Sequence, residues 1–321
     1  MISAKIIADS ITEQGNRLTT MVLIYPRIIH SEFMTHRMFS KNSASSRAIP
    51  FKKMAEMVKK NPFIPLRFQK DHPGMQGTTY FEGAEHDACV KQWLSARDAA
   101  LKNAEAMNTS KVTKQLCNRL LEPFMYHTVI VTASDYENFF ALRANPNAEI
   151  HIAELAERML EAYNESVPRN LRGGEWHVPF GDQMDMIRIK ELTTDKSRMS
   201  FYLTMVKIAT ARCARVSYQN YEGKDDYNAD IALYDRLSGD GHFSPFEHCA
   251  IVMTYHERDI WTRTIPDPNG ILPYLVQHAW CGNFQGFIQM RKFLANENRK
   301  DTRVIQKTYD KEKKSTSSEV G

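Results

Sequence analysis

A polar stretch near the start of the chain, THRMFSKNSASSRA at residues 35–48, carries residue types that bind anions. It combines two arginines and a histidine with five hydroxyl side chains. A planar guanidinium offers a fork of donors to phosphate oxygens, and neighbouring hydroxyls can complete such a cradle. The stretch is therefore either a phosphate-binding turn or an ordinary solvated turn.

Two further arginines lie in apolar surroundings. Arg119 lies within QLCNRLLEP, and Arg143 ends NFFALR. An arginine in such a place must extend its head group to solvent or find a partner. Each of the two either contacts a ligand or simply offsets the dipole at a helix end.

The segment GHFSPFEHCAIV places His242, Glu247 and His248 just before a hydrophobic run. Histidine and carboxylate are common metal ligands, but this spacing matches no zinc motif and no cysteine pair completes it. We therefore predict no metal, and these histidines are either structural or line a ligand site. The sequence also lacks the G-x-G-x-x-G, G-x-x-x-x-G-K-[ST] and G-x-S-x-G motifs.

Length and charge limit the class of protein. The 321 residues are 42% hydrophobic, and 42 basic against 38 acidic residues give a net charge of +4. So small a charge argues against a surface that coats nucleic acid. The five cysteines are scattered without a C-x-x-C pair, and no run is long and apolar enough to span a bilayer. We expect a cytoplasmic protein that binds neither membrane nor nucleic acid.

The first half should alternate strands and helices around these residues. The β-branched segments 3–11 and 17–26 predict paired strands, and Ile29, Phe33 and Arg37 at four-residue spacing predict a helix over 27–39. Further along we expect a loop at 61–80, helices at 81–109 and 112–122, and a strand at 126–133. A short helix that ends at Arg143 should follow, with Ser134 or Asp135 as its N-cap, and then an amphipathic helix at 148–168.

The second half should follow a Gly- and Pro-rich connector at 169–182. Helices at 196–213, 229–238 and 283–295 and a strand at 249–256 are predicted. The tail from residue 310 has mixed charge and almost no apolar residue, so we predict disorder there. Helices and strands mixed without strict alternation indicate an α+β fold.

The polar stretch resembles the signature of the flavin-dependent thymidylate synthases. That signature is Arg-His-Arg, seven residues, a serine, and a further arginine two residues on. Thr35 replaces its first arginine, and Ser43 replaces the glutamate that usually follows the asparagine. The matching positions are His36, Arg37, Ser40, Asn42, Ser45 and Arg47.

Two later segments of the first half extend the resemblance. NRLLEP is similar to the family's Ala-Arg-x-x-Leu-Pro segment, which implies a nucleotide contact for Arg119. ENFFALRANPN is similar to its Asn-Phe-x-x-Leu-Arg-Ala segment, which implies that Asn138 lies near flavin and Arg143 at the nucleotide. Asn147 stands where the family has a histidine.

Two segments of the second half resemble elements that normally precede the signature. These are ARVSY at 214–218 and HFSPFEH at 242–248, which here follow it by some two hundred residues. The chain thus resembles a permuted or enlarged member of the family. If the fold is kept, both segments return beside the signature, and His248 reaches the flavin.

The resemblance implies an α+β fold with a mixed or antiparallel sheet and long helices, enlarged here by a C-terminal region and assembled as a homotetramer. The reaction it implies moves a one-carbon unit from 5,10-methylenetetrahydrofolate to carbon 5 of dUMP, giving dTMP. FAD would supply hydride and NADPH would reduce the flavin. The expected partners are thus a pyrimidine deoxynucleotide and further copies of the chain.

The resemblance also implies a role for each matching residue. Substrate contacts would come from Arg37, Ser45, Arg47, Arg119 and Arg143, of which Ser45 and Arg143 would also be catalytic, with Ser45 orienting the nucleotide. Flavin contacts would come from His36, Arg37, Ser40, Asn42, Asn138 and His248. The predicted regions are a nucleotide- and flavin-binding part at 1–165, a connector at 166–207, elements completing the flavin site at 208–300 and a disordered tail at 301–321.

Two other functions stay open. One is hydroxymethylation of the base, or action on dCMP in place of dUMP. It is motivated by Thr35 and Ser43, which replace an arginine and a glutamate of the signature, and by the extra C-terminal third of the chain. A non-catalytic nucleotide- or nucleic-acid-binding protein could use the same basic groups, although the modest net charge argues against it.

Overall fold

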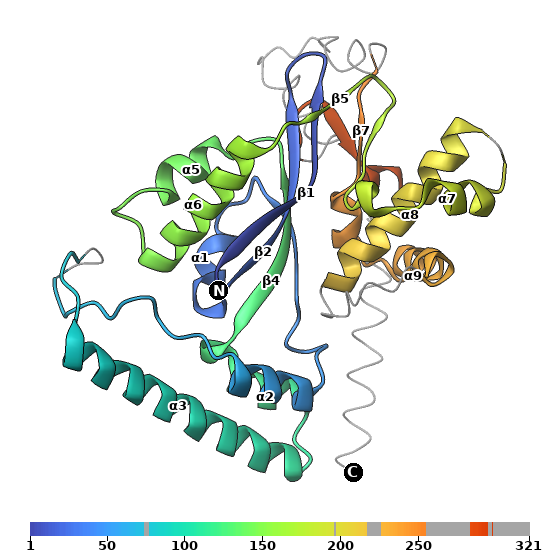
Figure 1. Cartoon of the computed structure of the whole chain (residues 1–321). Helices are drawn as coiled ribbons and strands as arrows, with labels where there is room; N and C mark the ends of the chain where they lie inside the picture. Colours follow the sequence, from blue (N-terminus) through green and yellow to red (C-terminus); the bar gives the residue numbers. More distant parts are fainter. Residues whose placement is uncertain (74–76, 196, 217–225, 255–282, 295–296, 298–321) are drawn as a thin grey trace, which may run out of the picture.

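A computed structural model of the chain describes residues 1–73, 77–195, 197–216, 226–254, 283–294 and 297. Its centre is a five-stranded sheet with helices on both faces, as Figure 1 shows. This confirms the predicted α+β class with a mixed sheet. No helix within the described ranges has the length and apolar character needed to cross a membrane.

Two long antiparallel strands begin the sheet, as predicted. β1 (Ser3–Thr12) pairs with β2 (Arg17–Pro26), and β2 pairs with β4 (Tyr126–Ala133). The strand order is β3-β4-β2-β1-β5. β5 (Arg169–Leu171) runs parallel to β1 and covers it from Ser10 to Thr12 only, so the sheet is mixed.

The polar stretch forms the opposite edge of this sheet. The predicted helix over 27–39 is wrong beyond Met34: a 3-10 turn (Arg27–Ile29) leads into α1 (His30–Met34), and β3 (Ser40–Ser43) follows on β4. Ile29 and Phe33 are buried as the helical spacing required, but Arg37 is exposed. Only two residues of the predicted pattern, Ile29 and Phe33, therefore pack in the core, and they stabilise little more than one helical turn.

One face of the sheet is covered by α5 (Glu137–Arg143) and α6 (Ile150–Glu165). The amphipathic prediction for α6 is confirmed, because Ile152, Leu155, Ala156 and Met159 are fully buried against β2 and β4. The predicted N-cap of α5 is wrong: Tyr136 occupies that position, although the Asp135 carboxylate accepts a hydrogen bond from the Glu137 N–H.

Three helices form a lobe beyond the end of β4, visible at the bottom of Figure 1. They are α2 (Phe51–Lys60), which the sequence did not lead us to expect, α3 (Gly83–Thr109) and α4 (Lys114–Arg119). α4 is shorter than predicted, and a 3-10 turn (Glu122–Phe124) follows it. The predicted loop at 61–80 is confirmed over its described residues, with a bridge between Gln69 and Tyr80.

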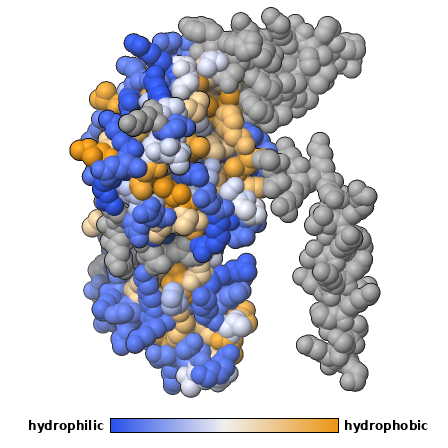
Figure 2. Space-filling view, turned by 90° about the vertical axis from the view of Figure 1, so that its right-hand side faces the viewer, coloured by the Kyte–Doolittle hydropathy of each residue, from blue (hydrophilic) through white to orange (hydrophobic). Residues whose placement is uncertain are grey.

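The second half covers the other face of the sheet. Its described residues form a small sheet of β6 (Trp176–His177), β7 (Ala250–Val252) and β8 (Phe287–Gln289). They also form the helices α7 (Met186–Leu192), α8 (Arg198–Val216) and α9 (Tyr227–Asp240), and 3-10 turns at Gly181–Gln183, Ser244–Glu247 and Met290–Phe293. Figure 2, which faces this side, shows apolar patches on a largely polar surface. Exposed apolar side chains of the second half include Ile187, Met199 and Leu203.

The predicted helices at 196–213 and 229–238 are confirmed by α8 and α9. The predicted helix at 283–295 is wrong, because its residues form β8 and a 3-10 turn. Gly286 has φ 75°, a left-handed conformation that breaks a helix, and the three residues after it are buried in pairing with β7. β7 confirms the start of the strand at 249–256; the predicted disordered tail lies outside the described residues.

Candidate functional site

The polar stretch is divided between buried and exposed side chains. Along β3, Ser40 and Asn42 are buried, since alternate residues of a strand face opposite sides. Gln289 Nε2 donates to Ser40 Oγ over 2.9 Å, and Ser40 Oγ donates to Asn283 Oδ1 over 3.1 Å. Both residues predicted to contact flavin on this strand thus face the second half.

Asn42 ties the same strand to two more segments of the second half. Its Nδ2 donates to the carbonyl of Cys213 in α8 over 2.8 Å, and its Oδ1 accepts from Ser244 Oγ over 3.3 Å. Ser244 belongs to HFSPFEH. This segment therefore does return beside the signature strand, as the resemblance implied.

His36 and Arg143, far apart in sequence, are in contact. Arg143 Nε donates to His36 Nε2 over 3.2 Å, and Arg143 Nη1 pairs with Glu32 over 2.5 Å. Burial, with the charges of Arg143 and Lys41, lowers the pKa of His36 to about 4. His36 is therefore neutral near pH 7 and accepts at Nε2, which fixes the orientation of the Arg143 guanidinium.

Lys41 closes the turn between α1 and β3. Its Nζ donates to the carbonyls of His36 and Met34, over 2.5 and 3.3 Å. Burial lowers the pKa of Lys41 to about 8. Sequence analysis gave this residue no role, although it lies inside the polar stretch.

Ser45, Arg47 and Arg119 are gathered at one loop. The buried Asn118 donates from Nδ2 to the carbonyls of Ser46 and Ile49, over 2.7 and 2.9 Å. Ser46 Oγ donates to Glu122 over 2.6 Å. These bonds hold the 45–49 loop against the end of α4, where Arg119 lies next to Asn118.

Three of the predicted arginines have no internal partner. Arg37, Arg47 and Arg119 are exposed and make no hydrogen bond or ion pair with any residue that the structure describes. Asn138, exposed on α5, is likewise free among those residues. Unpaired guanidiniums around one strand are available to an anionic ligand.

His248 lies elsewhere, on the second-half side of the sheet. It is fully buried, with Nδ1 2.8 Å from Thr132 Oγ1 in β4. α5, which carries Asn138 and Arg143, packs on the opposite face. Within one chain the sheet therefore separates His248 from these two residues, and its flavin contact stays a prediction.

His248 ends a buried chain of hydrogen bonds that we call the seam: Ser10, His177, Thr20, Thr132 and His248. The distances along it are 2.9 Å from Ser10 Oγ to His177 Nδ1, then 2.8 Å each from His177 Nε2 to Thr20, from Thr20 to Thr132 and from Thr132 to His248. Of these residues only His248 was predicted from the sequence, although the hydroxyl residues inside otherwise apolar strands were a visible signal.

Both imidazoles of the seam are neutral. Burial lowers the pKa of His177 to about 3, and burial with the nearby His177 lowers that of His248 to about 3. A neutral imidazole has one donor and one acceptor, so every bond along the seam must point the same way. In one direction His248 Nε2 carries a proton; in the other it is an acceptor. This buried atom has no hydrogen-bond partner among the residues that the structure describes.

Two of the buried cysteines, Cys213 and Cys249, are poorly suited to nucleophilic attack. Burial raises the pKa of Cys249 to about 12 and that of Cys213 well above its usual value. Cys117 is also buried. The thiolate is the reactive form, so the two thiols with raised pKa are inert at neutral pH. Among the described residues, no group of three or more histidine, cysteine, aspartate or glutamate side chains is placed to hold a metal ion.

Comparison with known proteins gives a match over the first half. The family model described as thymidylate synthase complementing protein matches residues 10–169. Similar solved structures include those of a UMP/dUMP methylase PolB from Streptomyces cacaoi, bound with 5-Br UMP (16% identity, TM-score 0.42) and with 5-Br dUMP (15% identity, TM-score 0.41). Both alignments cover 51% of this chain, and they cover 89% and 91%, respectively, of the two solved chains. No curated protein matches the sequence.

Proposed function

Because its segment 10–169 belongs to the family of thymidylate synthase complementing proteins, we propose that this chain transfers a one-carbon unit from 5,10-methylenetetrahydrofolate to carbon 5 of dUMP, giving dTMP. The observation that carries the proposal is the set of exposed, unpaired arginines around the signature strand: Arg37, Arg47 and Arg119.

In the proposal these arginines bind the phosphate of the nucleotide. Each charge-assisted hydrogen bond contributes about 1.5–3 kcal/mol, so three or four of them account for micromolar affinity. Ser45, on the loop that carries Arg47, orients the nucleotide. The Asn118 bonds stabilise this loop before the ligand arrives, which lowers the entropy lost on binding.

Arg143 is proposed to act on the base. Its Nε and Nη1 are already held by His36 and Glu32, so the rest of the guanidinium is fixed in direction. A fixed cation facing the uracil carbonyls stabilises negative charge that develops on the ring without having to reorient. His36 supports this role as a positioning residue.

FAD is the proposed cofactor, with NADPH as its reductant; bound reduced flavin would supply the hydride. The exposed Arg37 and Asn138 fit a flavin on the α5 side of the signature. The unpartnered Nε2 of His248 fits a polar contact on the other side of the sheet. Ser40 and Asn42 bond within the chain, so in the proposal they shape the wall of the site.

A homotetramer with shared active sites is also proposed. Large apolar side chains are exposed close in sequence to Arg37, Arg119 and Arg143, namely Met34, Met38, Leu116, Leu120 and Leu142. Such surfaces are typical of association sites. A second copy placed there would bring its own residues to the arginines and complete a site that one chain divides between two faces.

A second candidate is hydroxymethylation, or action on dCMP. Thr35 favours it, because this exposed, neutral residue stands where the family signature has an arginine, and its hydroxyl donates to the Glu32 carbonyl. With one cation fewer, the site would stabilise less negative charge on the base or flavin.

The test is anaerobic incubation of the protein with FAD, NADPH, methylenetetrahydrofolate and either dUMP or dCMP, with products identified by mass. The proposal expects dTMP from dUMP. A product heavier than dTMP by one oxygen, or turnover of dCMP alone, would favour the second candidate. Protein that takes up no flavin and turns over neither nucleotide would contradict both and leave a binding protein.

A further inference from the structure

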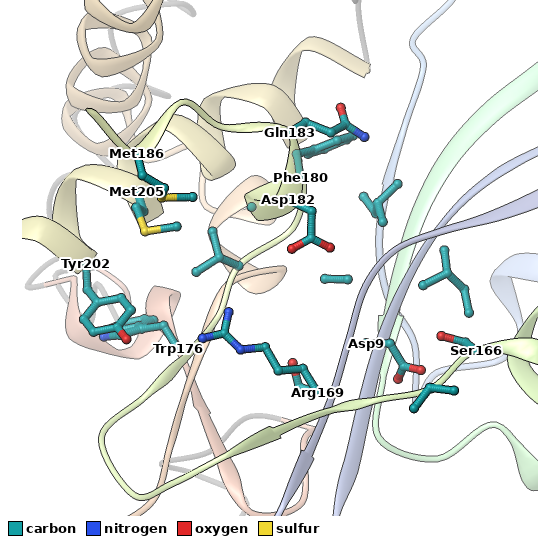
Figure 3. Close-up of a pocket in the computed structure, with 17 residues that line it drawn as sticks. Asp9, Ser166, Arg169, Trp176, Phe180, Asp182, Gln183, Met186, Tyr202 and Met205 are labelled. Carbon is teal, nitrogen blue, oxygen red and sulfur yellow. The ribbon is translucent and has the colours of Figure 1, made fainter. Parts of the chain in front are cut away.

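A pocket of about 310 Å³ lies between the sheet and the second half. One wall is the edge of β1 from Ile6 to Ser10, continued by Arg169 of β5. The other wall comes from the Gly181–Gln183 turn, α7 and α8. Figure 3 shows this pocket with its lining side chains.

The pocket is distinct from the arginine signature. In the strand order β3-β4-β2-β1-β5 the signature strand is one edge and β5 the other. Three strand spacings separate β3 from β1, about 14 Å at about 4.8 Å each. None of the residues predicted to bind nucleotide or flavin lines the pocket.

Opposite charges face the pocket without pairing. The Arg169 guanidinium and the Asp182 carboxylate both point into it in Figure 3. Both residues are exposed, and neither makes an ion pair or hydrogen bond with any residue that the structure describes. The space between them therefore offers a donor on one side and an acceptor on the other.

Flat and polarisable side chains line another part of this space, while Asp9, which also lines it, is paired with Arg17. Trp176 is buried and lies near Arg169 together with Tyr202, and the thioethers of Met186 and Met205 lie above them in Figure 3. Aromatic faces bind planar rings by stacking, and methionine adapts to their outline. These walls favour a planar ligand over a flexible one.

The backbone at the pocket is strained. Phe180 has φ 61°, a left-handed conformation that is unfavourable for a residue other than glycine. Its N–H donates to the Ile7 carbonyl over 3.0 Å, and its ring is buried. This conformation starts the turn that carries Asp182 into the pocket. Strain of this kind is concentrated at functional sites.

The buried Ser10 is a further polar residue of the lining, which also includes Asp9, Ser166 and Gln183. It is also the first member of the seam, 2.9 Å from His177 Nδ1. When His177 donates to it, the Ser10 hydroxyl is free to donate into the pocket. A ligand acceptor at Ser10 would therefore favour one direction of the seam.

We propose that this pocket binds a planar cyclic amide, the donor–acceptor edge that pyrimidine bases and pterins share. The ring N–H donates to Asp182, the adjacent carbonyl accepts from Arg169, and the ring stacks on Trp176 and Tyr202. A zwitterionic amino acid would match the two charges but has no flat amide to fill the space between the aromatic walls. The inference does not depend on the proposed function.

The test is calorimetric titration of the full chain with deoxyuridine, 6-hydroxymethylpterin and phenylalanine. Deoxyuridine or the pterin should bind saturably, and which of them binds identifies the source of the amide. Arg169→Ala and Asp182→Asn should each weaken binding about tenfold or more, because each removes a hydrogen bond to a charged group. The matched controls Arg172→Ala and Glu191→Gln alter exposed residues outside the pocket and should bind as the unaltered chain does.

Repeating the titration with Arg37→Ala/Arg47→Ala separates this pocket from the signature site. The proposal expects unchanged binding there, because the ring probes carry no phosphate. Binding that is lost in that double variant but retained in Arg169→Ala and Asp182→Asn would assign the ring to the signature and overturn the inference. So would saturable binding of phenylalanine alone, or of no probe.

Discussion

The exposed arginines of the signature and the buried seam are both polar, but they use their polarity in opposite ways. Arg37, Arg47 and Arg119 are charged, exposed and unpaired within the described residues. The seam is neutral and buried, and within the described part of the chain its one unpaired ring nitrogen is His248 Nε2. Charge that must bind a ligand stays in water until the ligand arrives, whereas polar groups that join two halves must find partners inside the protein.

The difference follows from the cost of burial. A buried charge without a partner is far more expensive than a buried hydroxyl or neutral imidazole with one. The seam therefore uses threonine, serine and two histidines whose pKa values are lowered to about 3. Substitution should accordingly affect ligand binding at the arginines and stability at the seam.

The largest effect is expected from Arg37→Ala/Arg47→Ala. Losing two charge-assisted bonds to phosphate should weaken dUMP binding about 100-fold, measured by calorimetry. Since neither arginine has a partner among the described residues, the free energy of unfolding should change by less than about 0.5 kcal/mol. Arg236→Ala, an exposed arginine on α9, is the control. Undiminished dUMP affinity in the double variant would remove the arginines from the site.

Thr20→Val should have the next largest effect, this time on stability. The change keeps the shape of the side chain but leaves His177 Nε2 and the Thr132 hydroxyl without their shared partner. We expect a loss of about 2 kcal/mol in the free energy of unfolding, measured with urea. Thr109→Val, at the exposed end of α3, should cost less than about 0.5 kcal/mol. Equal losses in the two variants would mean that the seam contributes nothing special.

Asn118→Leu should affect both quantities, because Asn118 is a buried group that holds the loop of Ser45 and Arg47. Losing its two bonds should cost about 1–2 kcal/mol of stability. The loosened loop should also weaken dUMP binding several-fold, since ordering it would then oppose binding. Gln115→Leu, on the exposed side of α4, is the control. Lower stability with unchanged affinity would show that the loop is not part of the site.

The smallest effect concerns pH. The unfolded chain protonates histidine near pH 6.5, whereas the folded seam resists protonation until about pH 3. Between these values the unfolded state binds more protons, so stability falls as pH falls. From pH 7 to 6 each seam histidine should lower the free energy of unfolding by about 0.7 kcal/mol.

His177→Gln removes one of these titrating groups. The decrease in the free energy of unfolding from pH 7 to pH 6 should therefore be about 0.7 kcal/mol smaller in this variant than in the unaltered chain. His242→Gln, at an exposed position, should leave the pH dependence unchanged. The measurement is urea unfolding at the two pH values. An identical pH dependence in His177→Gln would show that His177 is not held neutral.

Local sequence patterns predicted the elements that have a strong hydrophobic periodicity or clear turn and capping residues at their ends. The strands β1, β2 and β4 and the helices α3, α6, α8 and α9 were expected within a few residues. The errors came where short segments pack against distant ones. α1 stops after one turn because β4 supplies hydrogen bonds to the polar stretch, and β8 forms because β7 pairs with it. Neither partner is near in sequence.

The sequence by itself determined the family of residues 10–169 and the anion-binding character of the polar stretch, because residue types and their spacing carry that information. Only the tertiary structure decided which polar groups stay free. Folding buries Ser40, Asn42 and His248 between the halves, leaves Arg37, Arg47 and Arg119 exposed, and faces Arg169 toward Asp182. The hydrogen bonds of the buried Ser40, Asn42 and His248 join residues more than a hundred positions apart, so no local pattern records them.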